Sequence, residues 1–330
     1  MLIEAFTEAK DPSAPHTNED RLVILPGRAY AVIDGVTDRL GTRFDGMLSG
    51  QYAAVTVQRA LEHMLSAPDG TEDPVAVVEA LTAALAPVYE KYGMAARAKA
   101  DWNFRISAAL ALVLVGRETV HVLLVGDSGV RINGKYTLRV EKDLDLITSI
   151  LRRQAWPVIG QKVSDPGKHE QMSRQVTWHG TRQSLDNVAG TLDADDMAFI
   201  ESRAIAANLE ALPHVARTDI ENLVRGGIVN AQGGYQNNAS LQLGYPCLDG
   251  FEVPQHMLMI EKIPRSDVRT VEIYSDGYFK PGDGFGVAAW EKAFAEAERE
   301  DPAKVLLYPS PKGSTASLWA DDRAYLGVRF

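Results

Sequence analysis

The chain alternates short apolar runs, which end in glycine-containing turns, with stretches that repeat apolar residues at helical spacing. The first such region, residues 22–34, reads LVILPGRAYAVID and has one apolar run on each side of Pro26-Gly27. Because proline and glycine together favour a turn, this pattern predicts two short strands, the second of which ends at Asp34.

The middle of the chain carries the strongest strand signal. Residues 106–116 and 118–128 are nearly continuous apolar runs, which predict neighbouring antiparallel strands in a sheet that is covered on both faces. Residues 130–138 contain Asn133-Gly134, the pair that a tight hairpin turn prefers. Further strands are predicted over 270–276 and, as a hairpin, over 314–330.

Amphipathic stretches predict several helices, which span residues 49–65, 73–92, 143–154, 195–212 and 288–300. Ser49 is expected to cap the first helix, while Pro74 stands near the start of the second and Gly93 just past its end. Residues 230–244 are polar and rich in glycine, which predicts a mobile surface loop. Because the sequence shows neither repeats nor a low-complexity linker, residues 1–330 are expected to form one domain.

Composition and charge narrow the class of protein. The 330 residues include 34 Lys and Arg against 44 Asp and Glu, so the formal net charge is -10, which disfavours binding to nucleic acid. Cys247 is the single cysteine, which excludes a disulfide framework and suits the reducing cytoplasm. There is no secretory signal, and the longest apolar run is too short to cross a bilayer, so no membrane is expected either.

Acidic residues recur where the predicted strands begin and end. They are Asp34 and Asp276, each the first residue of an Asp-Gly pair, Asp127, Asp321, and the pair Glu19-Asp20 before the first strand. Taken singly, each acid is explained by turn or cap chemistry. Taken together, carboxylates at the ends of neighbouring strands can converge, and they then repel one another unless a cation lies between them. Oxygen ligands without nearby His or Cys favour Mg²⁺ or Mn²⁺.

The order of these motifs resembles that of the metal-dependent type 2C protein serine/threonine phosphatases. The resemblance runs from Asn18 to Phe330 and includes Ile106-Ser-Ala-Ala, which opens the strand pair that leads to Gly126-Asp-Ser. It implies an α+β fold, a four-layer α-β-β-α sandwich of two antiparallel sheets flanked by helices. It also implies a single catalytic domain with a variable helical or flap insertion around 180–245.

The resemblance assigns metal-binding roles to the acids at the strand ends. Asp34 matches the acid that bridges two metal ions, and Gly35 matches the residue whose backbone carbonyl joins it. Asp276 and Asp321 match the acids that hold the second ion. The implied cofactors are therefore two Mg²⁺ or Mn²⁺ ions.

The remaining acids have implied roles around these ions. Glu19 and Asp20 match the pair that orders metal-bound waters, and Asp127 matches a ligand of a weak third ion. Catalysis is expected from Asp34, Asp276 and Asp20. A water shared by two ions would attack phosphorus in line with the departing serine or threonine oxygen of a phosphorylated protein substrate.

The chain departs from the family pattern at several positions. Val36 stands where eukaryotic members have a histidine proposed as general acid, so another group has to protonate the leaving oxygen. Pro15 stands where many members have an arginine that binds phosphate. Weak candidates to replace that arginine are His16, Arg39 and Arg43.

Lys280 stands where many members have an aspartate that helps to hold the third ion. Because a lysine ammonium can neutralise Asp127 and Asp276 without an ion, the third site is expected to be altered or absent. Lys280 is also a weak candidate for binding phosphate. The alternative is that its side chain only points to solvent.

Other functions compete with this reading. A catalytically weak, phosphatase-like regulatory module that binds a phosphorylated partner is suggested by the missing histidine and arginine. A dinucleotide enzyme is suggested by residues 282–286, Gly-Asp-Gly-Phe-Gly, but the glycine spacing differs from GxGxxG. The surroundings of Cys247 lack the arginine-bearing phosphate loop of a thiol-based phosphatase. The EF-hand spacing of calcium ligands is also missing.

Overall fold

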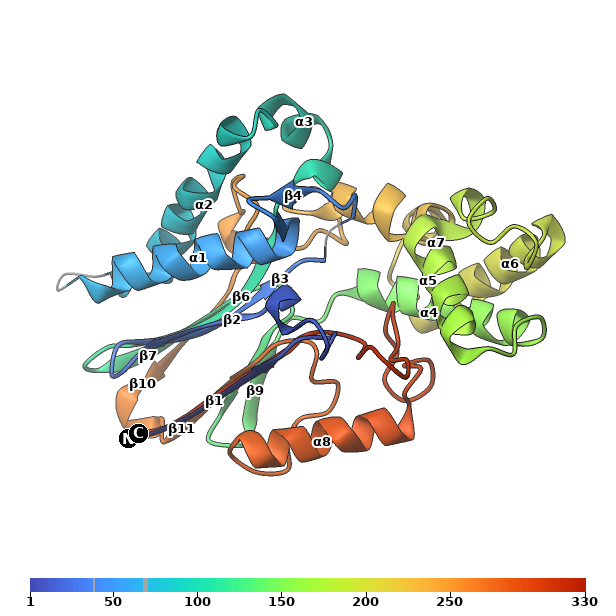
Figure 1. The fold of residues 1–330 in the computed structure, drawn as a ribbon. Coiled ribbons are helices and arrows are strands. Elements are labelled where there is room, and N and C mark those ends of the chain that lie inside the picture. The colour runs from blue at the N-terminus through green and yellow to red at the C-terminus, as the bar shows by residue number, and fades with distance from the viewer. Residues whose placement is uncertain (38, 68–70) are drawn as a thin grey trace.

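Two five-stranded antiparallel sheets form the centre of the structure, a computed structural model that describes residues 1–37, 39–67 and 71–330 (Figure 1). The first sheet consists, in spatial order, of β1 (Leu2–Glu8), β12 (Arg323–Arg329), β11 (Thr270–Tyr274), β8 (Gly129–Ile132) and β9 (Tyr136–Arg139). The second consists of β10 (Met259–Pro264), β7 (Thr119–Val125), β6 (Ala108–Val115), β3 (Ala29–Gly35) and β2 (Arg21–Leu25). The short strands β4 (Arg43–Phe44) and β5 (Met47–Leu48) pair separately.

The helices lie outside the two sheets (Figure 1). They are α1 (Ser49–Ser66), α2 (Pro74–Lys91), α3 (Ala95–Ala100), α4 (Asp143–Gly160), α5 (Pro166–Gln183), α6 (Ala194–Ala211), α7 (Arg217–Asn230) and α8 (Val287–Glu300). Helices α1 and α2 cover the outer face of the second sheet, and α8 covers the outer face of the first. None of the described helices combines the length and apolar character that a bilayer crossing requires.

Side chains of β3 alternate between two cores. Ala31 and Ile33 pack with α1 and α2, whereas Tyr30 and Val32 pack between the two sheets. This period of two is the reason that an apolar run with no polar face forms a central strand. The layer order is helix, sheet, sheet, helix, which confirms the predicted α+β sandwich.

Local sequence signals account for most of these elements. Strands β2 and β3 flank Pro26-Gly27 as predicted, and β6 pairs with β7. The hairpin of β8 and β9 turns at Asn133-Gly134, both of which have positive φ. One prediction about a helix start was wrong: α1 begins at Ser49, and no side-chain hydrogen bond caps it.

The predicted C-terminal hairpin over 314–330 was also wrong. Residues 314–322 contain bends and no regular structure, and within 314–330 only β12 is a strand. Strand β12 lies between β11 and β1, and Leu2 pairs with Arg329, so the two chain ends lie side by side (Figure 1). The partner of β12 is therefore the N-terminal strand, which the sequence pattern did not predict.

Helices α4–α7 form a separate body beside the sandwich with an apolar core of their own (Figure 1). This body begins at Asp143, well before residue 180, where the resemblance places the start of an insertion. The glycine-rich segment 230–244 is only in part the surface loop that we predicted, because residues 239–242 are exposed but residues 231–233 are buried. Gln232, Gly233 and Tyr235 are buried, and a Cβ atom on Gly233 would overlap the Trp102 ring.

Candidate active site

A pocket of about 440 Å³ lies where strands of both sheets end beside the helical body. Asp34 reaches it from β3 in the second sheet, and Asp276 reaches it from the segment directly after β11 in the first. Asp127 follows β7, and Asp321 precedes β12. Four of the acids selected from the sequence therefore line one pocket, although they are up to about three hundred positions apart in the chain.

Close backbone packing positions Asp34 and Gly35. Asp34 pairs with Ala109 in the ladder between β3 and β6. A Cβ atom on Gly35 would lie 2.4 Å from the carbonyl oxygen of Gly50, so the end of β3 touches the first turn of α1. Only glycine permits this approach, which explains the residue after Asp34 on structural grounds.

Glu19 and Asp20 are buried next to this pocket, with 1% and 2% of their surfaces exposed. Ser275 donates a 2.7 Å hydrogen bond to Asp20 Oδ2, and the backbone nitrogen of Glu19 donates to Asp322 at 3.1 Å. The other oxygens, Asp20 Oδ1 and Glu19 Oε1, are buried without a hydrogen-bond partner. A buried acceptor without a partner is costly, so these two oxygens are available to a cation or to a water bound to one.

The carboxylates of the pocket repel one another. Burial and the charges of Asp20, Asp276 and Asp321 hold the pKa of Asp34 well above its ordinary value. Burial and then Asp322 do the same to the pKa of Asp20. Burial and the neighbouring Asp321 raise the pKa of Asp276 to about 7. Three acids therefore share a space that lacks enough positive charge to ionise them all.

Lysines partly compensate this negative charge. Lys142 Nζ lies 2.7 Å from Asp127 and 3.0 Å from Asp145, a further acid of the pocket. Although burial acts to raise it, the Lys142 ammonium lowers the pKa of Asp127 below its ordinary value. Lys312 Nζ lies 2.6 Å from Asp321.

A lysine outside the pocket lining, Lys10, contacts two buried acids, Glu19 and Asp322. Lys10 Nζ lies 2.5 Å from Glu19 and 3.3 Å from Asp322. The backbone nitrogen of Lys10 donates to Asp322 as well, at 2.6 Å. Lys10 thus connects the end of β1 to the segment before β12.

Lys280 does not have the contacts that the sequence suggested. Its ammonium lies 2.7 Å from Glu296 and 4.0 Å from Glu300, both on α8, so it is not the cation that neutralises Asp127 and Asp276. The prediction that Lys280 neutralises Asp127 and Asp276 was therefore wrong, and the lysine that pairs with Asp127 is Lys142.

Of the other candidates for binding phosphate, only Arg39 lines the pocket. His16 lies in a short 3-10 turn, where its carbonyl accepts a hydrogen bond from Gln51, and the exposed Arg43 donates to the carbonyl of Gly46. Neither side chain belongs to the pocket lining. Arg139, which the sequence did not single out, does line it, and its Nε donates to the carbonyl of Asp127 at 3.2 Å.

The acids in and beside the pocket offer carboxylate oxygens, which are the ligand atoms that a hard divalent cation prefers. Two of these oxygens, Glu19 Oε1 and Asp20 Oδ1, are buried without a hydrogen-bond partner. As placed, however, no three His, Cys, Asp or Glu side chains in the described ranges are close enough together to hold one ion. Glu19 and Asp321 make ion pairs with lysines instead. Binding an ion would therefore require these acids to exchange contacts.

Neither Val36 nor Cys247, which lie near the acids, supplies a general acid or a nucleophile. Val36, which replaces the family's histidine, packs against the apolar core of the helical body. Cys247 lines the pocket, but burial raises the pKa of its thiol to about 12, so it is not a thiolate nucleophile at neutral pH. Among the residues that the structure describes, the pocket lining includes no histidine.

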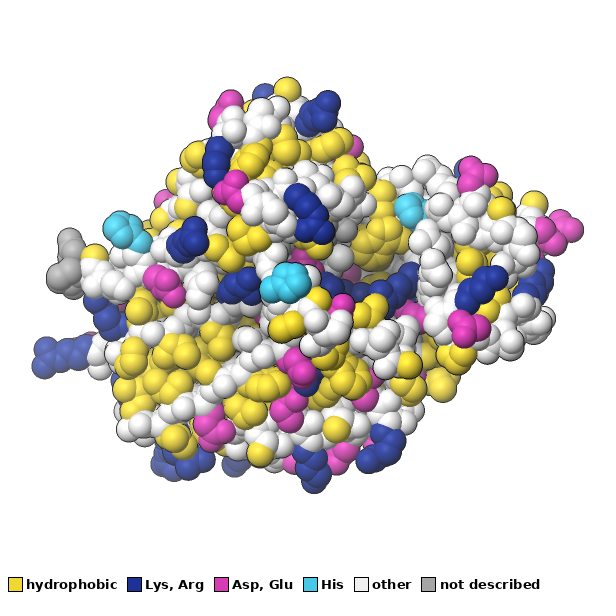
Figure 2. Space-filling model, in the orientation of Figure 1, with side chains coloured by type: hydrophobic (Ala, Val, Ile, Leu, Met, Phe, Trp, Pro, Cys, Tyr) yellow, Lys and Arg dark blue, Asp and Glu magenta, His cyan; other side chains and the backbone are white. Residues whose placement is uncertain are grey.

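The lysines and Arg139 were missed because the sequence around them has no distinguishing signal. Lys312 lies in PSPKGS and Lys142 in VEKDLD, where a solvated lysine is the ordinary expectation. The acids that these lysines contact are identified only by the three-dimensional structure. Figure 2 shows Lys or Arg and Asp or Glu side chains next to one another in the hollow between the sandwich and the helical body.

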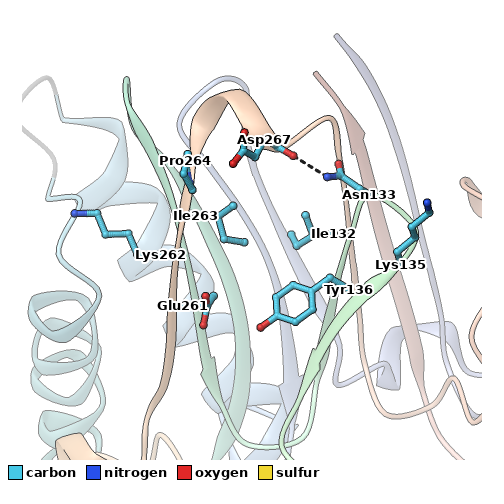
Figure 3. A pocket seen from close by; sticks show the side chains of 9 residues that line it. All are labelled: Ile132, Asn133, Lys135, Tyr136, Glu261, Lys262, Ile263, Pro264 and Asp267. Carbon is cyan, nitrogen blue, oxygen red and sulfur yellow. Dashed lines mark hydrogen bonds between the residues drawn. The ribbon is translucent and has the colours of Figure 1, made fainter.

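A second pocket, of about 390 Å³, lies between the edge strands β9 and β10 (Figure 3). Ile132, Ile263 and Tyr136 lie in the space between the two sheets there, and Asn133 donates to the carbonyl of Asp267 at 2.7 Å. The acids of this lining are Glu261 and Asp267, whereas the first pocket brings together Asp34, Asp127, Asp276 and Asp321 from four separate segments. We therefore take the acidic pocket as the candidate active site.

Solved structures similar to this chain are bacterial serine/threonine phosphatases. The phosphatase Stp1 from Staphylococcus aureus is 11% identical with a TM-score of 0.48, and the match covers 100% of this chain and 95% of that one. The Mycobacterium tuberculosis phosphatase PstP/Ppp is 15% identical with a TM-score of 0.42, over 100% and 99% of the two chains. A PstP catalytic domain in complex with two manganese ions is 14% identical with a TM-score of 0.42, over 99% and 96%.

No family model and no curated protein matches the sequence. At these identities and TM-scores, the function has to be argued from the residues of the pocket itself.

Proposed function

We propose that the protein is a divalent-metal-dependent phosphatase that hydrolyses phosphoserine and phosphothreonine in proteins. The observation that carries this proposal is the convergence of Asp34, Asp20 and Asp276 in a region that also contains basic side chains. Burial raises the pKa of each of these three carboxyl groups, and the charge of Asp321 raises it further. The specificity for phosphoserine and phosphothreonine follows from the resemblance of the acid motifs to the type 2C phosphatases. The chain would act as one catalytic domain in the cytoplasm.

Asp34, Asp276 and the carbonyl of Gly35 are the groups that would hold a cation in the pocket, with Glu19 and Asp20 acting through water. Asp321 is the further ligand that the resemblance implies. A bound Mg²⁺ or Mn²⁺ would offset the charge of the carboxylates and of the phosphoryl group and make water a stronger nucleophile at neutral pH. Oxygen ligands alone do not select between these two metals.

The basic residues of the pocket are suited to bind the phosphoryl oxygens. Arg39 and Arg139 line it, and arginine presents a planar fork of donors that matches a phosphate group. Their charges would draw a phosphorylated side chain toward the acids in spite of the net charge of -10. Leaving-group protonation falls to a group other than histidine, since the described lining of the pocket contains none.

Phosphate release from phosphoserine and phosphothreonine peptides tests this proposal. We expect turnover with Mn²⁺ or Mg²⁺, loss of turnover with EDTA, and a drop of at least about a hundredfold for Asp34→Asn. Lys162→Met is the matched control, because its ion pair with Asp196 lies on the surface of the helical body. Turnover equal to that of Asp34→Asn in every metal would refute catalysis.

A regulatory module that binds a phosphorylated partner is the second candidate. The replacement of the family's histidine by Val36, which makes an apolar contact with the helical body, favours it. Such a module would bind the same phosphopeptides without turnover. Calorimetric titration of phosphorylated and unphosphorylated peptides distinguishes the two functions, since binding of the phosphorylated form without phosphate release would support the module.

A further inference from the structure

We propose that Lys312 takes the place of the second divalent cation, so that this chain binds one metal ion tightly and a second ion only weakly. This inference rests on the proposed function, because it concerns the same acidic pocket. It differs from the two-ion centre that the sequence resemblance implies, and it concerns a residue of this chain that the resemblance does not assign.

The contacts of Lys312 place its ammonium among the acids. Nζ lies 2.6 Å from Asp321 Oδ2 and 3.4 Å from Thr37 Oγ1. Only 15% of the lysine side chain is exposed. Lys312 also lines the same pocket as Asp276.

The backbone around Lys312 is held by the helical body. The nitrogen of Gly313 donates to Glu170 at 2.7 Å, and Arg174 donates to the carbonyl of Gly313 at 2.8 Å. On the other side, Arg152, which is fully buried, donates to the carbonyl of Ser310 at 3.2 Å. Lys312 therefore extends from an anchored segment, unlike a surface lysine that samples many rotamers.

Asp20 contrasts with Asp321. The hydrogen bond that Asp20 Oδ2 accepts comes from the neutral hydroxyl of Ser275, and Oδ1 is buried without a partner. Asp321 instead has an ammonium at ion-pair distance. The need for an external cation is thus greatest at Asp34, Asp20 and Asp276, and least at Asp321.

A divalent ion and an ammonium repel one another when both approach the same carboxylate. A second ion at Asp321 has to displace Lys312. Its affinity is therefore lowered by the free energy that is needed to break the ion pair between Lys312 and Asp321. An ion held by Asp34 and Asp20 is less affected by this competition, because Lys312 makes its ion pair with Asp321 and not with either of these two acids. Unequal affinities for the two ions follow.

Titration of the metal-free, full-length protein with Mn²⁺ tests this inference, with calorimetry and electron paramagnetic resonance as readouts. Wild type is expected to bind one ion tightly. Lys312→Met should increase the affinity for a second ion by at least about tenfold and produce the spectrum of a coupled ion pair. Lys312→Arg keeps the charge and should keep the wild-type stoichiometry, which also controls for effects on folding.

Lys280→Met is the matched control, since Lys280 makes its ion pair with α8 outside the pocket lining. Two equally tight ions in wild type, or an unchanged second affinity in Lys312→Met, would overturn the inference while leaving the proposed function intact. Binding of no ion at all to wild type would instead contradict the proposed function, and the inference with it.

Discussion

Ser275 and Asp20, which are 255 positions apart in the sequence, are joined by a 2.7 Å hydrogen bond from the serine hydroxyl to the carboxylate. Ser275 follows β11 of the first sheet, and Asp20 precedes β2 of the second. The same hydroxyl accepts a 2.8 Å hydrogen bond from the backbone nitrogen of Ala324 in β12. One side chain thus ties together the segments that carry acids from both sheets.

Ser275→Ala is expected to lower the free energy of unfolding by about 1–3 kcal/mol, because it leaves a buried carboxylate and a buried backbone donor without partners. Urea unfolding followed by circular dichroism measures the change. The control is Ser266→Ala, an exposed serine that bonds only to its neighbour Asp267, with an expected effect within about 0.5 kcal/mol. Equal effects of the two substitutions would show that the bond to Asp20 contributes nothing.

Asp20→Asn is expected to stabilise the metal-free protein by about 0.5–2 kcal/mol at pH 8, because it removes one of several repelling carboxylates. The pKa of Asp20 is higher in the folded than in the unfolded protein. Its ionisation therefore costs no stability below the unfolded pKa, near 4, and an increasing amount as the pH rises toward the folded pKa.

Thermal unfolding in EDTA at pH 5 and pH 8 tests this prediction. The stability gained by Asp20→Asn should be larger at pH 8 than at pH 5, and stabilisation by Mn²⁺ should be smaller in the variant than in wild type. A variant that is less stable than wild type at both values would mean that Asp20 is not repelled by its neighbours.

Gly35→Ala is expected to cost roughly 1–3 kcal/mol and to weaken Mn²⁺ binding, because the new methyl group would meet the carbonyl of Gly50 at 2.4 Å. Moving the end of β3 away from α1 would shift Asp34. Gly167→Ala provides the comparison. Gly167 lies in the first turn of α5, and a Cβ atom there would make an ordinary 3.5 Å contact with the N-cap residue Asp165. Chemical denaturation and Mn²⁺ titration should separate the two alanine variants clearly.

Lys142→Met is expected to destabilise the protein by roughly 1–3 kcal/mol, because it leaves Asp127 and Asp145 without their shared cation in a mostly buried place. Lys162→Met removes a more exposed ion pair, with Asp196, and should cost less than about 1 kcal/mol. Unfolding in urea measures both. A neutral effect of Lys142→Met would show that Asp127 does not depend on Lys142 for its charge.

Elements with a continuous or periodic apolar pattern were predictable, as β3, β6, α1 and α8 show. Strand β1 was missed because Glu4, Thr7 and Glu8 interrupt its apolar residues, and its side chains stay exposed or half-buried at the edge of a sheet. Its pairing with β12 joins the two ends of the chain, and no local signal reports such a contact.

Helices α5 and α7 were missed for a different reason. The sequence of α5 is mostly polar, and Gly180 in α5 and Gly227 in α7 have positive φ, which interrupts the helical pattern. A Cβ atom on Gly180 would lie 2.2 Å from the carbonyl of Arg225, so the interruption serves the packing of the two helices.

The candidate site was predictable in its acids but not in its cations. Asp34 and Asp276 each follow an apolar run at the end of a sheet strand, a local pattern that carries information about position. Lys142 and Lys312 lie in polar segments, and their partners are set by how the helical body packs against the sandwich. The identity of a lysine's partner is a property of tertiary structure, which explains why Lys280 was selected wrongly.

Anomalous X-ray scattering from crystals soaked in Mn²⁺ would show whether the acids of the pocket form a metal centre. We expect a manganese peak within about 2–2.5 Å of carboxylate oxygens of both Asp34 and Asp276, one acid from each sheet. Manganese bound only elsewhere, or no peak in the pocket at saturating Mn²⁺, would contradict the claim that these acids form a metal centre.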